Sequence, residues 1–153
     1  MASQGGGGRG RHRARELLVK ALYQWQLAGH DLTELERQFS QMPEFAKVDK
    51  AYFRALLDKA VGEADDFDRA IAKFAARSLA QLDAVGRAIL LVALAELRYR
   101  PDVPTKVVIN EAVELAKRYG AAESFRFVNA VLDKAARSEG FRGSGAGDGA
   151  PAE

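Results

Sequence analysis

The sequence has no cysteine and only two histidines, His12 and His30, in 153 residues. Disulfides, thiolate nucleophiles and cysteine-ligated metals are therefore excluded, and the two histidines stand too far apart for a metal-binding pair. No Ser/His/Asp or HExxH arrangement can be assembled from them. The glycine run "GGGG" near the start lacks the lysine and hydroxyl residue of a phosphate-binding loop. We expect no metal, no other cofactor and no enzymatic activity.

Long apolar runs and strand-like alternation are also missing. No stretch approaches the length of a membrane span and no signal peptide is visible, so we expect a cytoplasmic protein without membrane contact. Apolar residues recur instead at helical spacing, from Leu17 to Leu132. The sequence therefore predicts an all-α fold of about six or seven helices.

Helix boundaries can be read from polar caps, glycines and prolines. Asp31, Asp49 and Asp83 each precede a helical pattern and are typical N-caps. Gly29 and Gly120 each follow one, where a left-handed C-terminal glycine is common. We expect one helical domain over residues 11–139, flanked by disordered glycine-rich tails at 1–10 and 140–153.

The acidic cluster Asp65, Asp66 and Asp68 is a weak candidate for a metal site. Three neighbouring carboxylates can suggest a divalent-cation site, but no loop glycine or further ligand follows at EF-hand spacing. Solvated surface is the favoured interpretation.

Positive charge is concentrated at the start of the first helix. The whole chain carries a formal +2, whereas residues 9–20 hold five cationic side chains against one carboxylate, a formal +4. Cations are unfavourable at a helix N-terminus because the unpaired amides there carry partial positive charge. Either this solvated end of the helix frays without harm, or its charge binds a polyanion such as nucleic acid.

The same helix places an aromatic residue on its polar side. At 100° per residue, Leu18 and Leu22 belong to the apolar stripe, whereas Tyr23 falls opposite, with Lys20. Tyr23 is either an ordinary amphipathic surface contact or a platform for base stacking, and the nearby arginines favour stacking. Arg11 and Arg15 precede the main apolar stripe, so we expect them to overhang the packed domain.

Three stretches together resemble the NusB family of bacterial transcription antitermination factors: "RHRARELLVKALYQWQ", "DVPTKVVINEAVELAKRYG" and "SFRFVNAVLDKAAR". The resemblance covers roughly residues 11–136. It implies two packed helical subdomains that bind the boxA element of nascent RNA, notably in ribosomal RNA leaders, together with the ribosomal protein NusE. That assembly, with RNA polymerase and other Nus factors, resists termination.

The resemblance also assigns RNA-binding residues by position. These are Arg11, His12, Arg13, Arg15, Tyr23, Glu123 and Phe127. Phe127 also fits a core position by its spacing with Val131. The chain departs from the family pattern at His12 (commonly arginine), Leu91 (often arginine) and Ala130 (commonly glycine). Leu91 either alters a partner surface or extends the core.

Two other functions remain as alternatives. A NusB-like RNA-binding module also occurs in rRNA methyltransferases, but those carry a large catalytic domain in addition. In the second alternative, the helical domain has no RNA affinity and its arginines bind an acidic protein partner. A monomer and a homodimer are both compatible with the pattern, because helix faces buried in a self-interface resemble core.

Overall fold

The computed structural model describes residues 6–75 and 82–143, which form seven α-helices and contain no strand. The helices are α2 (Arg11–Ala28), α3 (Leu32–Ser40), α4 (Lys50–Gly62), α5 (Ala64–Ala75), α6 (Ala84–Tyr99), α7 (Thr105–Tyr119) and α8 (Ser124–Ala136). A π-helical turn, η1 (Gly6–Gly10), precedes α2, and a 3-10 turn, η2 (Pro43–Lys47), links α3 to α4. The all-α prediction is confirmed.

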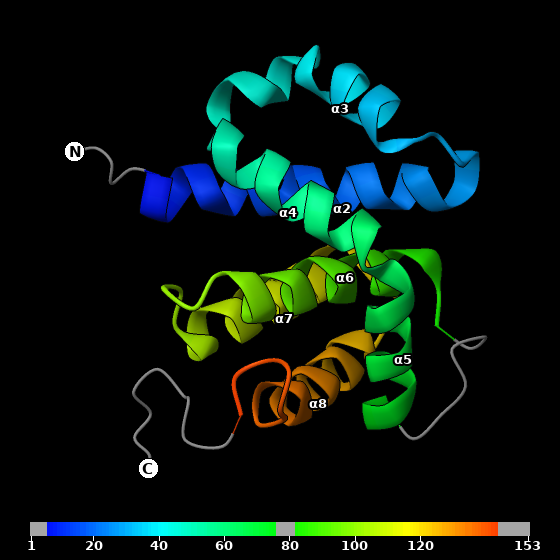
Figure 1. Ribbon diagram of the computed structural model, residues 1–153, viewed down its shortest axis with the longest axis vertical. Coiled ribbons are helices and arrows are strands. Elements are labelled where there is room, and N and C mark those ends of the chain that lie inside the picture. The colour runs from blue at the N-terminus through cyan, green and yellow to red at the C-terminus, as the bar shows by residue number, and fades with distance from the viewer. Residues whose placement is uncertain (1–5, 76–81, 144–153) are drawn as a thin grey trace.

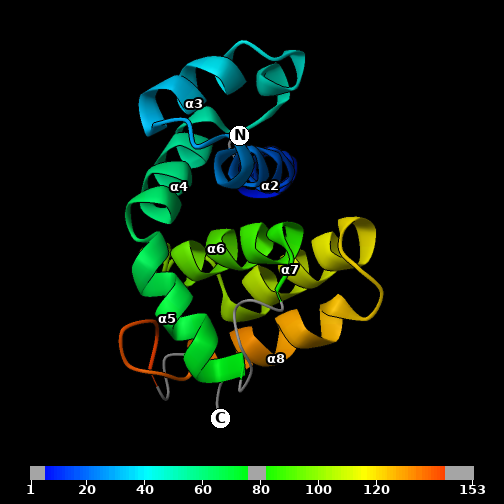
Figure 2. The same cartoon turned by 90° about the vertical axis from the view of Figure 1, so that its right-hand side faces the viewer.

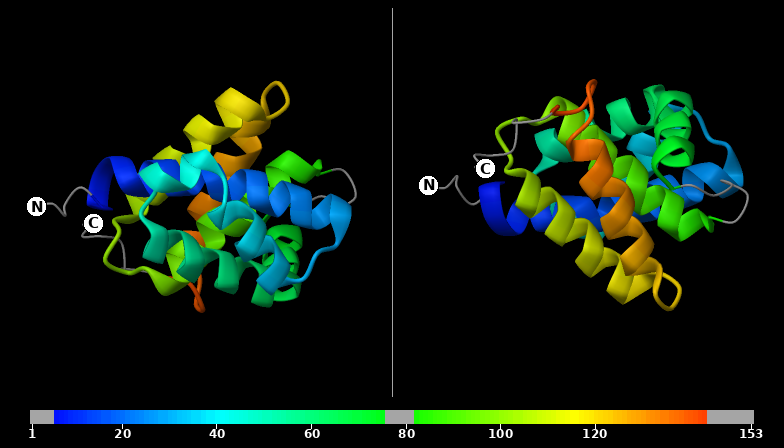
Figure 3. Two further views of the ribbon diagram at one scale, coloured as in Figure 1. Left: turned by 90° about the horizontal axis from the view of Figure 1, so that it is seen from above. Right: turned by 90° about the horizontal axis from the view of Figure 1, so that it is seen from below.

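The helices lie in two groups that share one core. Helices α2, α3 and α4 form one group, and α5 to α8 form the other (Figure 1). Helix α6 lies beneath α2 and joins the groups, since it packs on α2 and α4 on one side and on α7 and α8 on the other (Figure 2). Helices α7 and α8 run side by side within the second group (Figure 3). The buried apolar side chains of both groups form a single cluster.

Helix α6 is central because its sequence is apolar around nearly its whole circumference. Every residue from Ala88 to Leu97 is buried. Leu91, which replaces a frequent arginine of the family pattern, is fully buried. It therefore extends the core and contributes nothing to an exposed partner surface.

Side-chain caps fix the helix starts as predicted. Asp31, Asp49 and Asp83 each accept a hydrogen bond from the backbone N–H three residues on, at 2.8–3.1 Å. Gly29 adopts the expected left-handed conformation, with φ of 72°. Gly120 does not, since its backbone is extended, with φ of −87°. There a Cβ would lie 2.7 Å from the carbonyl oxygen of Ala116, so close approach is the reason for glycine.

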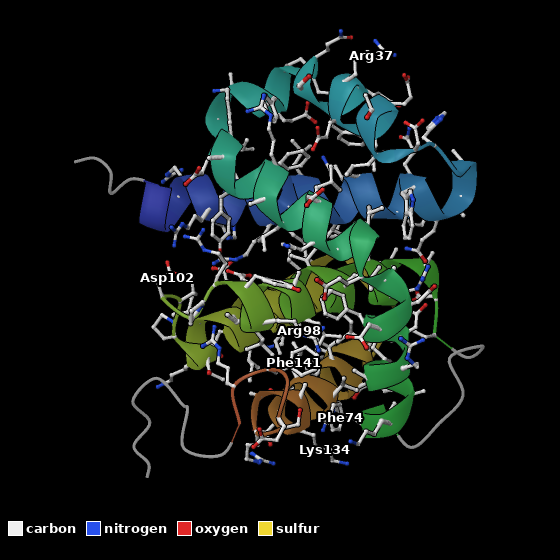
Figure 4. The ribbon with its side chains drawn as sticks, in the orientation of Figure 1. Arg37, Phe74, Arg98, Asp102, Lys134 and Phe141 are labelled. Atoms are coloured by element: carbon white, nitrogen blue, oxygen red, sulfur yellow. The ribbon has the colours of Figure 1, made fainter. Side chains whose placement is uncertain are left out.

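The domain is longer than predicted at both ends. Gly6–Gly10 forms a helical turn, and the Gly10 carbonyl accepts a hydrogen bond from Asp49 N at 3.0 Å. Phe141 packs on Phe67, with ring centroids 6.2 Å apart, and lies under the guanidinium of Arg98 (Figure 4). The prediction of disorder is therefore wrong for residues 6–10 and 140–143. Residues 1–5 and 144–153 lie outside the described residues.

Arg142 anchors this C-terminal segment to the end of α6. Its guanidinium donates hydrogen bonds to the carbonyl oxygens of Leu97, Arg100 and Val103 at 2.6–3.0 Å. The Leu97 carbonyl lies in the last turn of α6, where carbonyls have no partner within the helix, so the arginine satisfies it; the carbonyls of Arg100 and Val103 lie in the turn that follows. We call residues 140–143 the C-terminal strap.

None of the helices in the described parts of the chain combines the length and apolar character needed to cross a bilayer.

Candidate nucleic-acid interface

Arg15, predicted to contact RNA, lies inside the molecule. Its side chain is only 5% exposed, and its Nε lies 3.0 Å from both carboxylate oxygens of Glu96. The hydroxyl of Tyr52 donates to the same carboxylate. Burial is the largest single influence and lowers the pKa of the guanidinium, but the hydrogen bonds and the negative charge of Glu96, with Tyr52 and Glu111 nearby, together outweigh it and raise that pKa. The expectation that Arg15 overhangs the domain is therefore corrected.

Arg11 is also held against the protein. Its guanidinium lies 4.3 Å from the centroid of the Tyr52 ring, and its Nη1 donates to Asp102 at 3.5 Å. Asp49 lies 3.8 Å from its Nε. The side chain is 21% exposed. Arg11 therefore does not overhang the fold, and its charge is already opposed by carboxylates.

His12 faces two carboxylates, one from α7 and one from α2 itself. Its Nδ1 lies 2.8 Å from Glu111 Oε1, and its Nε2 lies 3.6 Å from Glu16 Oε2. The ring is 43% exposed. Where the family commonly has arginine, this chain therefore has a histidine tied to α7 by Glu111.

Arg13 differs from its neighbours because it has no hydrogen bond, ion pair or ring contact within the described residues. It is partly exposed and lines two hollows, of about 310 and 530 Å³, that flank α2. Lys47 on η2 lines the smaller hollow with it and likewise has no hydrogen bond, ion pair or ring contact from its side chain among the residues that the structure describes. Two cations thus face the same open space without a counter-charge.

The carboxylates of the smaller hollow are already engaged. Glu16 accepts a hydrogen bond from Arg118, and Glu44 lies 3.6 Å from the ammonium of Lys20. Because each acid faces its own cation, the charges of Arg13 and Lys47 remain uncompensated. A phosphate group is the ligand that such a hollow favours.

An apolar hollow adjoins the basic one. It has a volume of about 400 Å³ and is lined by both Tyr23 and Tyr119, which are 41% and 43% exposed. Glu16, Lys20 and Tyr119 line this hollow and the basic hollow alike, so the two are continuous. We call the combined feature the α2 groove. Exposed rings beside free cations suit stacking of unpaired bases next to bound phosphates.

The structure confirms that Tyr23 is exposed, and it adds Tyr119, Lys20 and Lys47, which sequence reasoning did not assign. The available signal for Tyr119 was an aromatic at the end of an amphipathic helix, directly before Gly120. Lys47 carried no recognisable signal, because its role depends on how η2 packs beside α2.

Glu123 and Phe127 lie elsewhere. They line a separate hollow of about 530 Å³ that shares no lining residue with the α2 groove. Glu123 has a positive φ of 68° and pairs with Arg126, whereas Phe127 is half-buried against the core. The α2 groove and this hollow both border the start of α6, through Val85 and Leu82 respectively.

Two of the three carboxylates in the acidic cluster considered as a metal site form ion pairs with arginines. Asp68 receives two hydrogen bonds from Arg87, at 2.7 and 2.9 Å, and Asp66 receives one from Arg98 at 2.5 Å. No group of residues suited to holding a metal occurs in the part of the chain that the structure describes.

The NusB family model matches residues 12–137, which span all seven helices. The chain belongs to the NusB family. It is 50% identical over 126 residues to the transcription antitermination protein NusB of Sodalis glossinidius, and 51% identical over the same length to that of Yersinia pestis. In both comparisons the alignment covers 82% of this chain and 91% of the relative.

Solved NusB structures share the fold. Thermotoga maritima NusB superposes with a TM-score of 0.74 at 32% identity, over 84% of this chain and 91% of that one. A NusB chain crystallised with NusE and double-stranded RNA superposes with a TM-score of 0.71 at 28% identity, over 82% and 95%. Within this NusB-family chain, α2 therefore carries the family's arginine-rich segment, but only part of that segment is open to a ligand.

Proposed function

We propose that this protein is a transcription antitermination factor that binds boxA RNA of nascent transcripts together with ribosomal protein NusE. It acts in the cytoplasm as a non-catalytic RNA-binding subunit of the RNA polymerase antitermination complex. Family membership supports this role, as does the relative crystallised with NusE and RNA. The observation that carries the proposal is Arg13, a cation of the arginine-rich segment left without a partner beside two exposed tyrosines.

Within this proposal the residues have different tasks. Arg13 and Lys47 attract phosphates, and Tyr23 and Tyr119 stack against unpaired bases. Arg15 holds α2 in place from inside and does not contact RNA. Arg11 and His12, tied to acids on neighbouring elements, orient the start of α2. Glu123 and Phe127 provide a second contact region near the start of α6.

The test is RNA binding by the full chain with and without NusE. Three probes are needed: single-stranded RNA carrying boxA, the same sequence as a duplex, and a scrambled single strand. We expect tightest binding to single-stranded boxA RNA in the presence of NusE. The double variant Arg13→Gln/Tyr23→Leu should weaken it strongly.

Lys134→Gln is the matched control, because Lys134 is an exposed cation of α8 at the opposite end of the molecule (Figure 4). It should bind RNA normally. Normal RNA binding by the double variant, with loss of an acidic protein partner, would instead assign the groove to protein docking.

A further inference from the structure

Beyond the α2 groove, a second set of cations occupies the corner where η2 turns into α4. Lys47, Lys50 and Arg54 are all exposed. Within the part of the chain that the structure describes, Lys50 and Arg54 have no hydrogen bond or ion pair from their side chains, and each rests on the ring of Phe45, at 5.7 and 5.3 Å from its centroid. Because Phe45 is buried, its ring is a fixed surface on which both cations rest. We call these three residues the α4 corner.

The carboxylates near the α4 corner leave its charge uncompensated. Asp49 accepts the hydrogen bond that caps α4 and faces Arg11, while Glu44 faces Lys20. Within α4 the single carboxylate is Asp58, one turn beyond Arg54. The corner is thus a local excess of positive charge.

The α4 corner is continuous with the groove. Lys47 belongs to both, since it lines the hollow of Arg13 and precedes Lys50 by one turn of chain. A chain of phosphates lying along Arg13 and Lys47 would therefore meet Lys50 and then Arg54 as it leaves the hollow. Spaced cations along a path are how proteins follow a single strand without reading its sequence.

The character of the α4 corner favours RNA over a protein partner. Protein interfaces are centred on aromatic or large apolar anchors that become buried. Within the described residues, none of the exposed large hydrophobic side chains lies on η2 or α4. A surface of cations without such an anchor suits a solvated polyanion.

We infer that the α4 corner binds the phosphate backbone of nucleotides flanking the boxA core, so that the RNA path continues from the α2 groove over Lys47 to Lys50 and Arg54. The inference rests on the proposed function and extends it. Contacts there depend on phosphate charge and do not read bases. They would lengthen the bound RNA without changing which core sequence is chosen.

The experiment compares Lys50→Gln/Arg54→Gln with the wild type on three single-stranded RNAs, in the presence of NusE. One RNA carries the boxA core alone, and the others extend it by a uridine tract on the 5′ or the 3′ side. Lys73→Gln/Lys134→Gln is the matched control, since Lys73 also rests on an aromatic ring and both lysines are exposed on the α5–α8 half. Thermal melting verifies that each variant is folded.

We expect one extension to strengthen wild-type binding and to steepen its salt dependence. The Lys50→Gln/Arg54→Gln variant should lose that gain, with a salt slope flatter by up to about 1.4 on the extended RNA, and should bind the core alone as the wild type does. The control should match the wild type on all three RNAs.

Several results would overturn the inference while leaving the proposed function intact. These are a wild type that binds the core but gains nothing from either extension, a variant that retains the gain, or a variant that weakens the core equally. A variant with normal binding to every RNA but weaker capture of NusE would assign the α4 corner to that protein. Failure of the wild type to bind any boxA RNA would contradict the proposed function itself.

Discussion

Arg15 and Glu96 form a buried ion pair between α2 and α6, in which Arg15 Nη2 lies 2.5 Å from Glu96 Oε2. The two helices belong to different groups, so the pair fixes the start of α2 relative to the central helix. An arginine of the segment that resembles an RNA-binding motif thereby serves the fold. Cations at the start of α2 are tolerated because carboxylates oppose them. These are Glu96, Glu111 and the Asp residues near Arg11.

Replacing Arg15 should damage stability far more than RNA recognition. Arg15→Gln leaves the carboxylate of Glu96 buried without its cation, which typically costs about 3–5 kcal/mol. Urea denaturation measures the loss. The double variant Arg15→Met/Glu96→Leu should be more stable than Arg15→Gln, because no uncompensated charge remains. A stable Arg15→Gln protein with weakened RNA binding would contradict the structural role.

Tyr52 should make stability sensitive to alkaline pH. Burial, followed by the nearby Glu96 carboxylate, raises the pKa of Tyr52 above its ordinary value of 10.0. The folded protein therefore holds the phenol proton more tightly than the unfolded chain does. The stability that Tyr52 contributes is present below about pH 10 and is lost as the pH rises above it.

Tyr52→Phe provides the comparison. It should cost on the order of 1–3 kcal/mol at neutral pH, since a buried acceptor on Glu96 loses its donor. Its unfolding free energy should then decline less steeply than that of the wild type as the pH passes 10. Parallel declines would show that Tyr52 is not the group responsible.

The C-terminal strap should stabilise the domain. A chain ending at Glu139 loses Phe141 from the core edge and the hydrogen bonds of Arg142, which together contribute on the order of 3 kcal/mol. A chain ending at Gly143 retains them. The melting temperatures of the two should differ clearly, and Phe141→Ala/Arg142→Ala in the full chain should reproduce the lower value. Equal melting temperatures would mean that the strap contributes nothing.

The exposed tyrosines of the groove should contribute to RNA affinity by stacking. Tyr23→Leu should weaken boxA binding by about 1–3 kcal/mol with little change in salt dependence, because no charge is removed. Tyr119→Leu should act in the same direction. Tyr99→Leu is the control, since Tyr99 is an exposed tyrosine that contacts Lys59 and Glu63 and lines neither part of the α2 groove. A comparable loss in Tyr99→Leu would point to a nonspecific effect.

The helices and their caps were predictable because they depend on local periodicity and on single residues such as Asp31 and Asp83. Which arginines of this segment would be paired with acids of the protein could not be predicted. Arg13 and Arg15 are two residues apart and look alike in the sequence, yet Arg15 pairs with Glu96 from α6, whereas Arg13 pairs with no acid in residues 6–75 and 82–143. Which arginine is neutralised depends on contacts across more than eighty residues of chain.

The ends of the domain were misjudged for a related reason. Glycine-rich composition around Phe141 and Arg142 indicates disorder, because few apolar side chains are available to offset ordering entropy. One aromatic ring and one guanidinium nevertheless find partners on α5, α6 and the turn that follows α6. Gly120 was likewise predicted to be left-handed, whereas the close carbonyl of Ala116 is what requires glycine.

The most direct test compares the salt dependence of boxA RNA affinity in Arg13→Gln and Arg11→Gln, two arginines of the same segment that differ in their partners. Titrations of single-stranded boxA RNA with NusE over a range of salt concentrations give the slope for each. Arg13→Gln should flatten the slope by about 0.7, the value for one phosphate contact on a single strand, and Arg11→Gln should change it much less. An unchanged slope in Arg13→Gln, or an equal change in Arg11→Gln, would contradict the assignment of the α2 groove as the phosphate-binding surface.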